Sequence, residues 1–105
     1  MFTSGSTGTP KGVRISLAAL ENFVEWMLSI PAIAKCGQGI TVNQSQFSFD
    51  LSVADLWPCF AVGATVWALK REEQQNLTVL YRALQESSAV RLTCTPSFIR
   101  LCLCD

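Results

Sequence analysis

The chain has 105 residues, of which 50% are hydrophobic and 15% are charged. This length corresponds to one small domain, and the composition excludes a charge-rich disordered tail. Eight basic residues balance eight acidic ones, so no overall positive field favours binding to nucleic acid or to anionic lipid.

Helical and strand patterns alternate along the chain. The segment 3–12 consists almost entirely of small and turn-forming residues, which predicts a loop. Beyond it, helices are indicated by apolar residues at helical spacing and by capping residues, and strands by short β-branched or apolar runs. The predicted elements are a strand at 13–16, a helix capped by Ser16 and stopped by Pro31, a strand at 40–43, a helix from about Asp50, a strand at 64–69, a helix capped by Asn76, a strand at 89–94 and a helix opened by Thr95-Pro96.

This alternation predicts an α/β fold, with strands and helices on a largely parallel sheet. The run 64–69 is apolar throughout, which is typical of a strand buried on both faces. Pro58 is expected to break or kink the helix that begins near Asp50, because proline has no backbone N–H to donate.

Several classes of site are excluded by residues that the sequence lacks. There is no histidine, which excludes histidine-dependent nucleophilic catalysis and a histidine general base. The five cysteines include no CxxC pair and predict reduced, mostly buried thiols, with no disulfide framework and no metal site. Since no membrane-spanning stretch or secretory leader is evident, we expect a cytoplasmic protein that does not bind membranes.

The loop 3–12 has the composition of an anion-binding loop. Its glycines, including Gly5 and Gly8, allow the backbone to approach a ligand and to turn its N–H groups inward. Lys11 supplies a positive charge, and hydroxyl groups donate to phosphate oxygens. The hydroxyl residues are Thr3, Ser4, Ser6, Thr7 and Thr9. Phosphate binding is therefore predicted; the alternative is a flexible surface turn.

The order of these residues separates the loop from the common nucleotide-binding motifs. Pro10 and Gly12 flank Lys11, which does not fit the usual P-loop, and the GxGxxG pattern is absent. Residues 2–13, FTSGSTGTPKGV, resemble instead the phosphate loop of the adenylate-forming, or AMP-binding, enzymes. That family includes acyl-CoA synthetases, luciferases and amino-acid adenylation domains.

The resemblance implies a reaction and a set of phosphate-binding residues. In that family the loop holds the phosphates of ATP, bound with Mg²⁺, while a carboxylate attacks the α-phosphate to give an acyl-adenylate and pyrophosphate. The residues that match the loop, and so are expected to contact ATP, are Thr3, Ser4, Gly5, Ser6, Thr7, Gly8 and Lys11. The resemblance assigns no catalytic residue and no metal ligand to this chain.

A second motif indicates the class of carboxylate. Residues 47–53, FSFDLSV, resemble the FDxS segment of family members that activate amino acids, in which the aspartate pairs with the α-ammonium group of the substrate. A cation that enters an apolar pocket is costly to bury without a carboxylate partner. Asp50 is therefore expected to bind the amino acid. Local sequence alone favours a simpler role, as a helix N-cap.

Softer similarities at 50–59, 63–65 and 95–98 resemble the family members that ligate D-alanine to a carrier protein. Those enzymes adenylate D-alanine and pass it to the phosphopantetheine thiol of a small carrier protein, which supplies D-alanine for teichoic acids. The alternatives are a segment of a nonribosomal peptide synthetase adenylation domain and a nucleotide-binding segment without catalysis.

The resemblance covers essentially the whole chain, 1–105, as one partial segment of the large N-terminal domain of such an enzyme. The family's adenine- and ribose-binding motifs and its lysine-bearing C-terminal domain have no counterpart in this sequence, so the isolated chain is expected to be inactive. Asp55 follows Asp50 by about 500° of helical rotation. The two carboxylates therefore form no catalytic pair, and Asp55 is expected to be structural or solvated.

Overall fold

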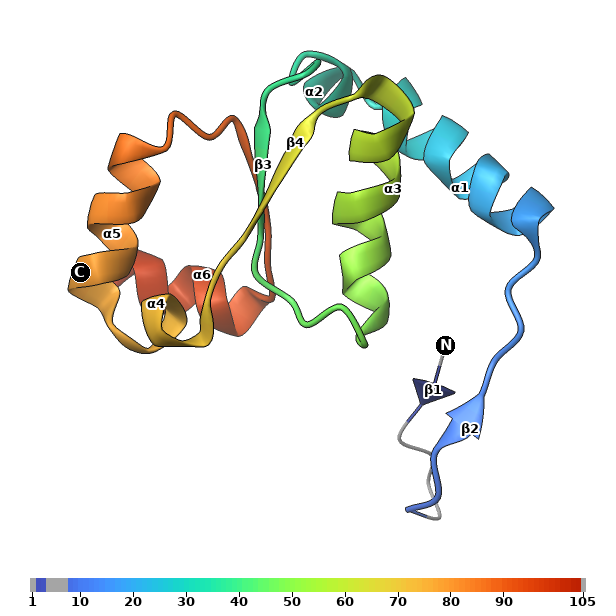
Figure 1. Ribbon diagram of the computed structural model, residues 1–105, viewed down its shortest axis with the longest axis horizontal. Helices are drawn as coiled ribbons and strands as arrows, with labels where there is room; N and C mark the ends of the chain where they lie inside the picture. Colours follow the sequence, from blue (N-terminus) through green and yellow to red (C-terminus); the bar gives the residue numbers. More distant parts are fainter. Residues whose placement is uncertain (1, 4–7, 105) are drawn as a thin grey trace.

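The computed structural model describes residues 2–3 and 8–104. In that part of the chain, helices and strands alternate as the sequence predicts, which confirms the α/β class (Figure 1). The elements are β1 (Phe2–Thr3), β2 (Lys11–Gly12), α1 (Leu17–Ser29), α2 (Pro31–Ala34), β3 (Ile40–Asn43), the 3-10 helix η1 (Asp50–Ser52), α3 (Val53–Val62), β4 (Thr65–Ala68), α4 (Arg71–Gln75), α5 (Leu77–Glu86), β5 (Arg91–Thr93) and α6 (Pro96–Leu103).

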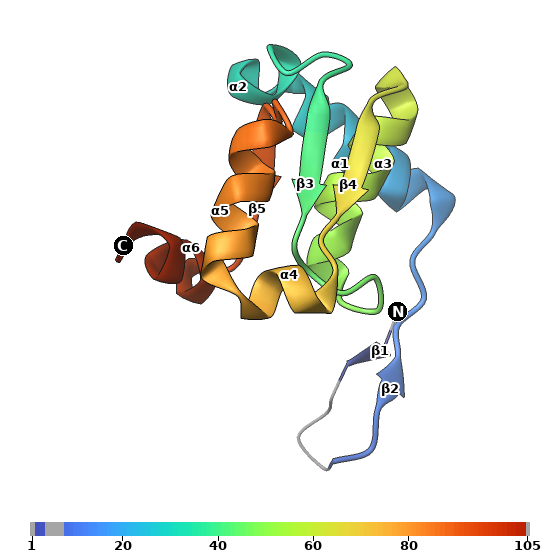
Figure 2. The same cartoon turned by 60° about the vertical axis from the view of Figure 1, so that its left-hand side comes forward.

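Three of these strands form a parallel sheet in the order β4-β3-β5. Ile40 of β3 lies opposite Thr65 of β4, and Thr41 of β3 lies opposite Arg91 of β5. The chain leaves β3 through α3 to reach β4 and then crosses back through α4 and α5 to reach β5 on the other side. The two crossovers run in opposite directions, so α1 and α3 cover one face of the sheet and α4, α5 and α6 the other (Figures 1 and 2).

The main hydrophobic core lies on the face of the sheet that carries α5 and α6. Its buried members are Val42, Leu69, Leu80 and Phe98. The five cysteines are free thiols, but the prediction that most are buried is wrong: Cys59 is buried, Cys104 is exposed and the other three are partly exposed. No helix in the described part of the chain is long and apolar enough to cross a membrane.

The strand predicted at 13–16 is wrong. The strand of this region is β2, which ends at Gly12 and pairs antiparallel with β1, Thr3 lying opposite Lys11. The β-branched residues that suggested a strand belong to the extended approach to α1, which begins after Ser16. Strand formation requires a pairing partner, and in this structure the partner β1 faces residues 11–12.

The strand predicted at 64–69 is confirmed in position, since β4 covers Thr65–Ala68. Its predicted burial on both faces is wrong, because β4 is an edge strand of the three-stranded sheet and its first and last residues are exposed. An unbroken apolar run therefore does not show whether a strand lies at the centre or the edge of a sheet.

The expectation that Pro58 breaks the helix is wrong: α3 continues through Pro58 to Val62 and ends at Gly63, whose φ of 71° lies in the left-handed region that favours glycine. Proline at position 58 leaves the carbonyl of Ala54, one turn earlier, without a helical donor. The Arg91 guanidinium from β5 donates a hydrogen bond to that carbonyl. A distant side chain thus replaces the missing backbone bond.

Candidate functional site

The glycine-rich loop closes a two-stranded hairpin. Backbone pairing of Phe2 with Gly12 and of Thr3 with Lys11 holds its two ends together, and Lys11 is exposed. Gly8 has a φ of 79°, a conformation that strains any residue with a side chain. The predicted phosphate contacts Ser4, Gly5, Ser6 and Thr7 lie outside the described residues.

The hairpin projects beyond the end of the sheet at which the parallel strands finish (Figures 1 and 2). The segment that joins β3 to α3 lies at the same end (Figure 1), and η1, which begins at Asp50, belongs to that segment. Ligands of open α/β sheets bind outside the carboxyl ends of the strands. The two motifs singled out in the sequence are therefore on the side of the sheet where a ligand is expected.

Asp50 is the first residue of η1, and its side chain is exposed. The N-cap position of η1 is held by Phe49 and that of α3 by Ser52, and neither makes a side-chain capping bond. The N-cap role that local sequence favoured for Asp50 is thus not observed. The structure leaves the carboxylate facing solvent.

The hydroxyl of Ser52 fixes the backbone that carries Asp50. Ser52 is buried, and the single proton of its Oγ is shared between the carbonyl oxygens of Phe49 at 2.8 Å and Phe47 at 3.2 Å. These bonds close the turn that leads into η1. The serine of the FDxS segment therefore shapes the turn, and the aspartate remains accessible.

Two cavities lie on either side of the Asp50 segment. One is a groove of about 950 Å³ between α1 and the start of α3, with Asp50 among its lining residues. Most of its lining is apolar and comes from Ile15, Leu20, Phe23, Met27, Leu51 and Trp57.

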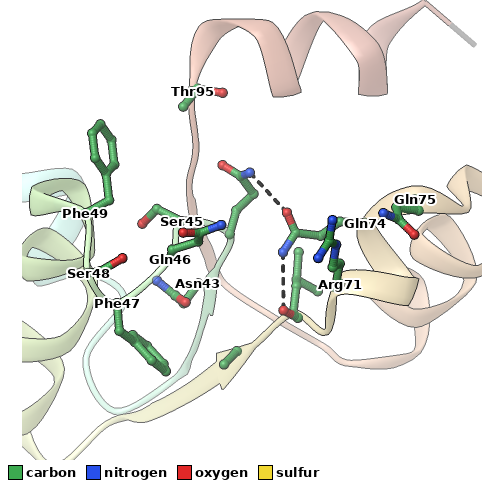
Figure 3. Close-up of a pocket in the computed structure, with 13 residues that line it drawn as sticks. Asn43, Ser45, Gln46, Phe47, Ser48, Phe49, Arg71, Gln74, Gln75 and Thr95 are labelled. Carbon is green, nitrogen blue, oxygen red and sulfur yellow. Dashed lines mark hydrogen bonds between the residues drawn. The ribbon is translucent and has the colours of Figure 1, made fainter. Parts of the chain in front are cut away.

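The other cavity, of about 880 Å³, lies at the carboxyl ends of β3 and β4 (Figure 3). It is lined mainly by polar side chains, and Gln44 donates to the side-chain oxygen of Gln74 at 3.2 Å. Among the described residues, neither the buried Ser45 hydroxyl nor the Gln44 side-chain oxygen has a hydrogen-bond partner. Phe47 and Phe49 line this cavity from the turn that precedes Asp50.

A buried polar cluster, which the sequence did not predict, lies in the part of α3 that follows the Asp50 segment. Asp55 of α3 is fully buried and accepts a hydrogen bond from the Asn43 amide at 2.8 Å. Its other oxygen lies 3.6 Å from the Arg91 guanidinium. Burial raises the pKa of the Asp55 carboxyl, while Asn43, Thr93 and Arg91 oppose that shift. The expectation that Asp55 is structural fits this burial; the expectation that it is solvated is wrong.

A sequence signal for part of this cluster existed. A carboxylate within the apolar run of α3 needs a polar partner if that helix packs on a sheet, and Pro58 leaves a carbonyl that needs a donor. Neither signal identifies Asn43 or Arg91, which are far away in the chain. No group of three or more histidine, cysteine, aspartate or glutamate side chains in the described ranges is arranged to hold a metal ion.

Comparison with known proteins identifies the family that the glycine-rich loop and the FDxS segment resemble. The family model of the AMP-binding enzymes matches residues 1–104, and the chain therefore belongs to that family. Along its whole length the chain is 43%, 41% and 39% identical to proteins named D-alanine–D-alanyl carrier protein ligase from Bacillus licheniformis, Bacillus velezensis and Bacillus anthracis. The chain spans 20% of the length of these relatives.

Proposed function

We propose that this chain is the phosphate-loop and amino-acid-recognition segment of an ATP-dependent ligase that adenylates D-alanine. The observation that carries the proposal is the identity of 39–43%, along the entire chain, to D-alanine–D-alanyl carrier protein ligases. It is supported by the presence, at one end of the sheet, of both a phosphate-type hairpin and an exposed carboxylate.

In the proposed reaction, a carboxylate oxygen of D-alanine attacks the α-phosphate of ATP. The bond to the β-phosphate breaks, pyrophosphate leaves and D-alanyl-adenylate forms. The phosphopantetheine thiol of a carrier protein then attacks the acyl carbon, which releases AMP, gives a thioester and frees the thiol proton. We place this reaction in the cytoplasm and, following the relatives' names, assign D-alanine and a carrier protein as the partners.

Residues of this chain would bind both reactants. The hairpin offers a backbone turn at Gly8 and the exposed ammonium of Lys11, which suit the phosphate oxygens of ATP. Thr3, Ser4, Gly5, Ser6 and Thr7 are proposed as further phosphate contacts, and Mg²⁺ would arrive with the nucleotide. The exposed Asp50 carboxylate would pair with the ammonium group of the amino acid.

The test is amino-acid-dependent pyrophosphate exchange by the protein that carries this chain at the length of its relatives. D-Alanine is expected to support exchange better than L-alanine, and propionate, which lacks the ammonium group, should support little. Preference for a bulky L-amino acid would favour a peptide-synthetase adenylation domain. The absence of exchange with any carboxylate would favour a nucleotide-binding segment without catalysis.

A further inference from the structure

The start of α3 is tied to the sheet by one buried carboxylate. Asp55 has no exposed surface, and the Arg91 side chain is 10% exposed. Asn43, at the end of β3, donates to Asp55 Oδ2 at 2.8 Å, while Arg91, at the start of β5, lies 3.6 Å from Oδ1. Two strands that are far apart in the sequence thus hold one side chain of the helix.

Arg91 makes a second contact with the same turn of the helix. Its Nη2 donates to the carbonyl of Ala54, the group that Pro58 leaves without a helical partner. The first turn of α3 is therefore attached to β5 through its backbone as well as through Asp55. At the other end, α3 closes on Gly63, and the Gln38 side chain donates to the Val62 carbonyl at 3.1 Å.

The turn that carries Asp50 continues directly into this tied segment. The backbone N–H of Val53 donates to the carbonyls of Asp50 and Leu51, so η1 and α3 form one continuous helical path. From residue 50 to residue 54 an α-helix rises by only about 6 Å. Because residues 50 and 54 are so close along one helical path, any displacement of the first turn of α3 would move the Asp50 carboxylate about as far as it moves that turn.

A buried ion pair is a weak source of stability, because desolvation of both groups offsets their attraction. Burial raises the pKa of Asp55, so the carboxylate is retained at a cost to the fold. A carboxylate at position 55 is therefore better explained by the way it holds α3 against the sheet than by a contribution to stability.

We infer that Asp55 is a positioning residue, which fixes the Asp50 carboxylate relative to the sheet through Asn43 and Arg91. The inference rests on the proposed function where it concerns the amino acid: a displaced Asp50 would meet the substrate ammonium in poor geometry. Asp55 itself contacts no reactant. Its loss should weaken the amino-acid step and leave the hairpin's handling of ATP intact.

The experiment compares Asp55→Asn with Glu72→Gln in the protein that carries this chain at the length of its relatives. Both changes neutralise one acidic residue in the first turn of a helix, but Glu72 is exposed. Asp55→Asn is expected to raise the KM for D-alanine about 10- to 100-fold and to change the KM for ATP by less than about twofold. Glu72→Gln should match the wild type in both. An unchanged KM for D-alanine with a lower Tm, or equal rises in both KM values, overturns the inference.

Arg91→Lys provides a second variant if Asp55→Asn does not fold. Lysine keeps the charge, but its single ammonium replaces the planar guanidinium whose Nη2 contacts both Asp55 and the Ala54 carbonyl. We expect the KM for D-alanine to rise by less than in Asp55→Asn, about three- to tenfold. Pro58→Ala in the Arg91→Lys background supplies a backbone N–H for Ala54 and should recover part of that loss. No rise in Arg91→Lys contradicts the inference.

Hydrogen exchange separates this inference from the proposed function. In the ligase-length protein, Asp55→Asn is expected to speed exchange of the amides of residues 53–57 about tenfold or more, with α5 unchanged. If the wild-type ligase-length protein activates no amino acid, the proposed function fails and this measurement alone decides whether Asp55 fixes the segment. Unchanged exchange at 53–57 overturns the positioning role.

Discussion

Asp50→Asn tests whether the exposed carboxylate of η1 binds the amino acid. Asparagine preserves the size of the side chain and removes its charge. In this chain Asp50 faces solvent at the edge of the groove between α1 and α3. A solvated pair of unit charges about 4 Å apart is worth roughly 1 kcal/mol, and the same pair near a protein surface roughly 4 kcal/mol.

The expected loss in kcat/KM depends on how far the pair of charges is removed from water. A fully solvated pair would lower kcat/KM for D-alanine by only about fivefold, at 1.4 kcal/mol per factor of ten. Truncating one partner of a desolvated charge pair costs about 2–5 kcal/mol, which is roughly 30- to 4,000-fold. We expect the larger range, because the ammonium group would be enclosed between Asp50 and the apolar residues of the groove.

The assay is pyrophosphate exchange with D-alanine, L-alanine and propionate, with thermal unfolding measured in parallel. Asp50→Asn should lose D-alanine activity while propionate, which has no ammonium group, is affected far less. The melting temperature should change little, because Phe49 and Ser52 hold the N-cap positions of η1 and α3. A wild-type kcat/KM for D-alanine in this variant would refute the reasoning.

Three further predictions concern the hairpin, the isolated chain and Asp55. Lys11→Ala should lower kcat/KM for ATP about tenfold or more with an unchanged Tm, because the side chain is exposed and a charged phosphate contact is lost; an unchanged ATP dependence of exchange would contradict this. The purified 105-residue chain should show no pyrophosphate exchange and should self-associate in sedimentation experiments, since the groove between α1 and α3 exposes Leu17, Trp26 and Trp57; an active monomer would be the opposite result. Burial raises the pKa of Asp55 above 3.8, so the folded state binds its proton more tightly and the free energy of unfolding should fall as pH rises from 3.8 through the raised pKa. Urea titrations should show that Asp55→Asn lacks this fall, and an identical pH dependence in variant and wild type would contradict the assignment.

Features set by neighbouring residues were predictable from the sequence. Ser16 Oγ accepts from the Ala19 amide at 3.1 Å, which starts α1 where the sequence placed it. Asn76 likewise caps α5, and Thr95 caps α6 with Pro96 in the first turn. An N-cap depends on groups only three residues apart, so its signal survives without knowledge of the fold.

Features that depend on distant partners were not predictable. The strand at 11–12 forms because β1 lies beside it, and β4 is partly exposed because no further described strand covers its edge. The helix survives Pro58 because Arg91 supplies a donor from another strand. In each case a contact elsewhere in the fold, or its absence, decided the outcome, and the local pattern carries no signal of it.

The two aspartates of the η1–α3 segment show how one helical turn serves two purposes. They are five residues apart, about 500° of rotation in an α-helix, which places them on different sides of the segment. Asp55 points into the protein, where Asn43 and Arg91 hold it, and Asp50 remains exposed on the side of the groove. A carboxylate that must meet a cationic substrate needs to be accessible and also to be held in one place. In this chain Asp50 itself provides the accessible carboxylate. Asp55 fixes its position together with the buried Ser52, whose hydroxyl bonds to carbonyl groups of the turn that precedes Asp50.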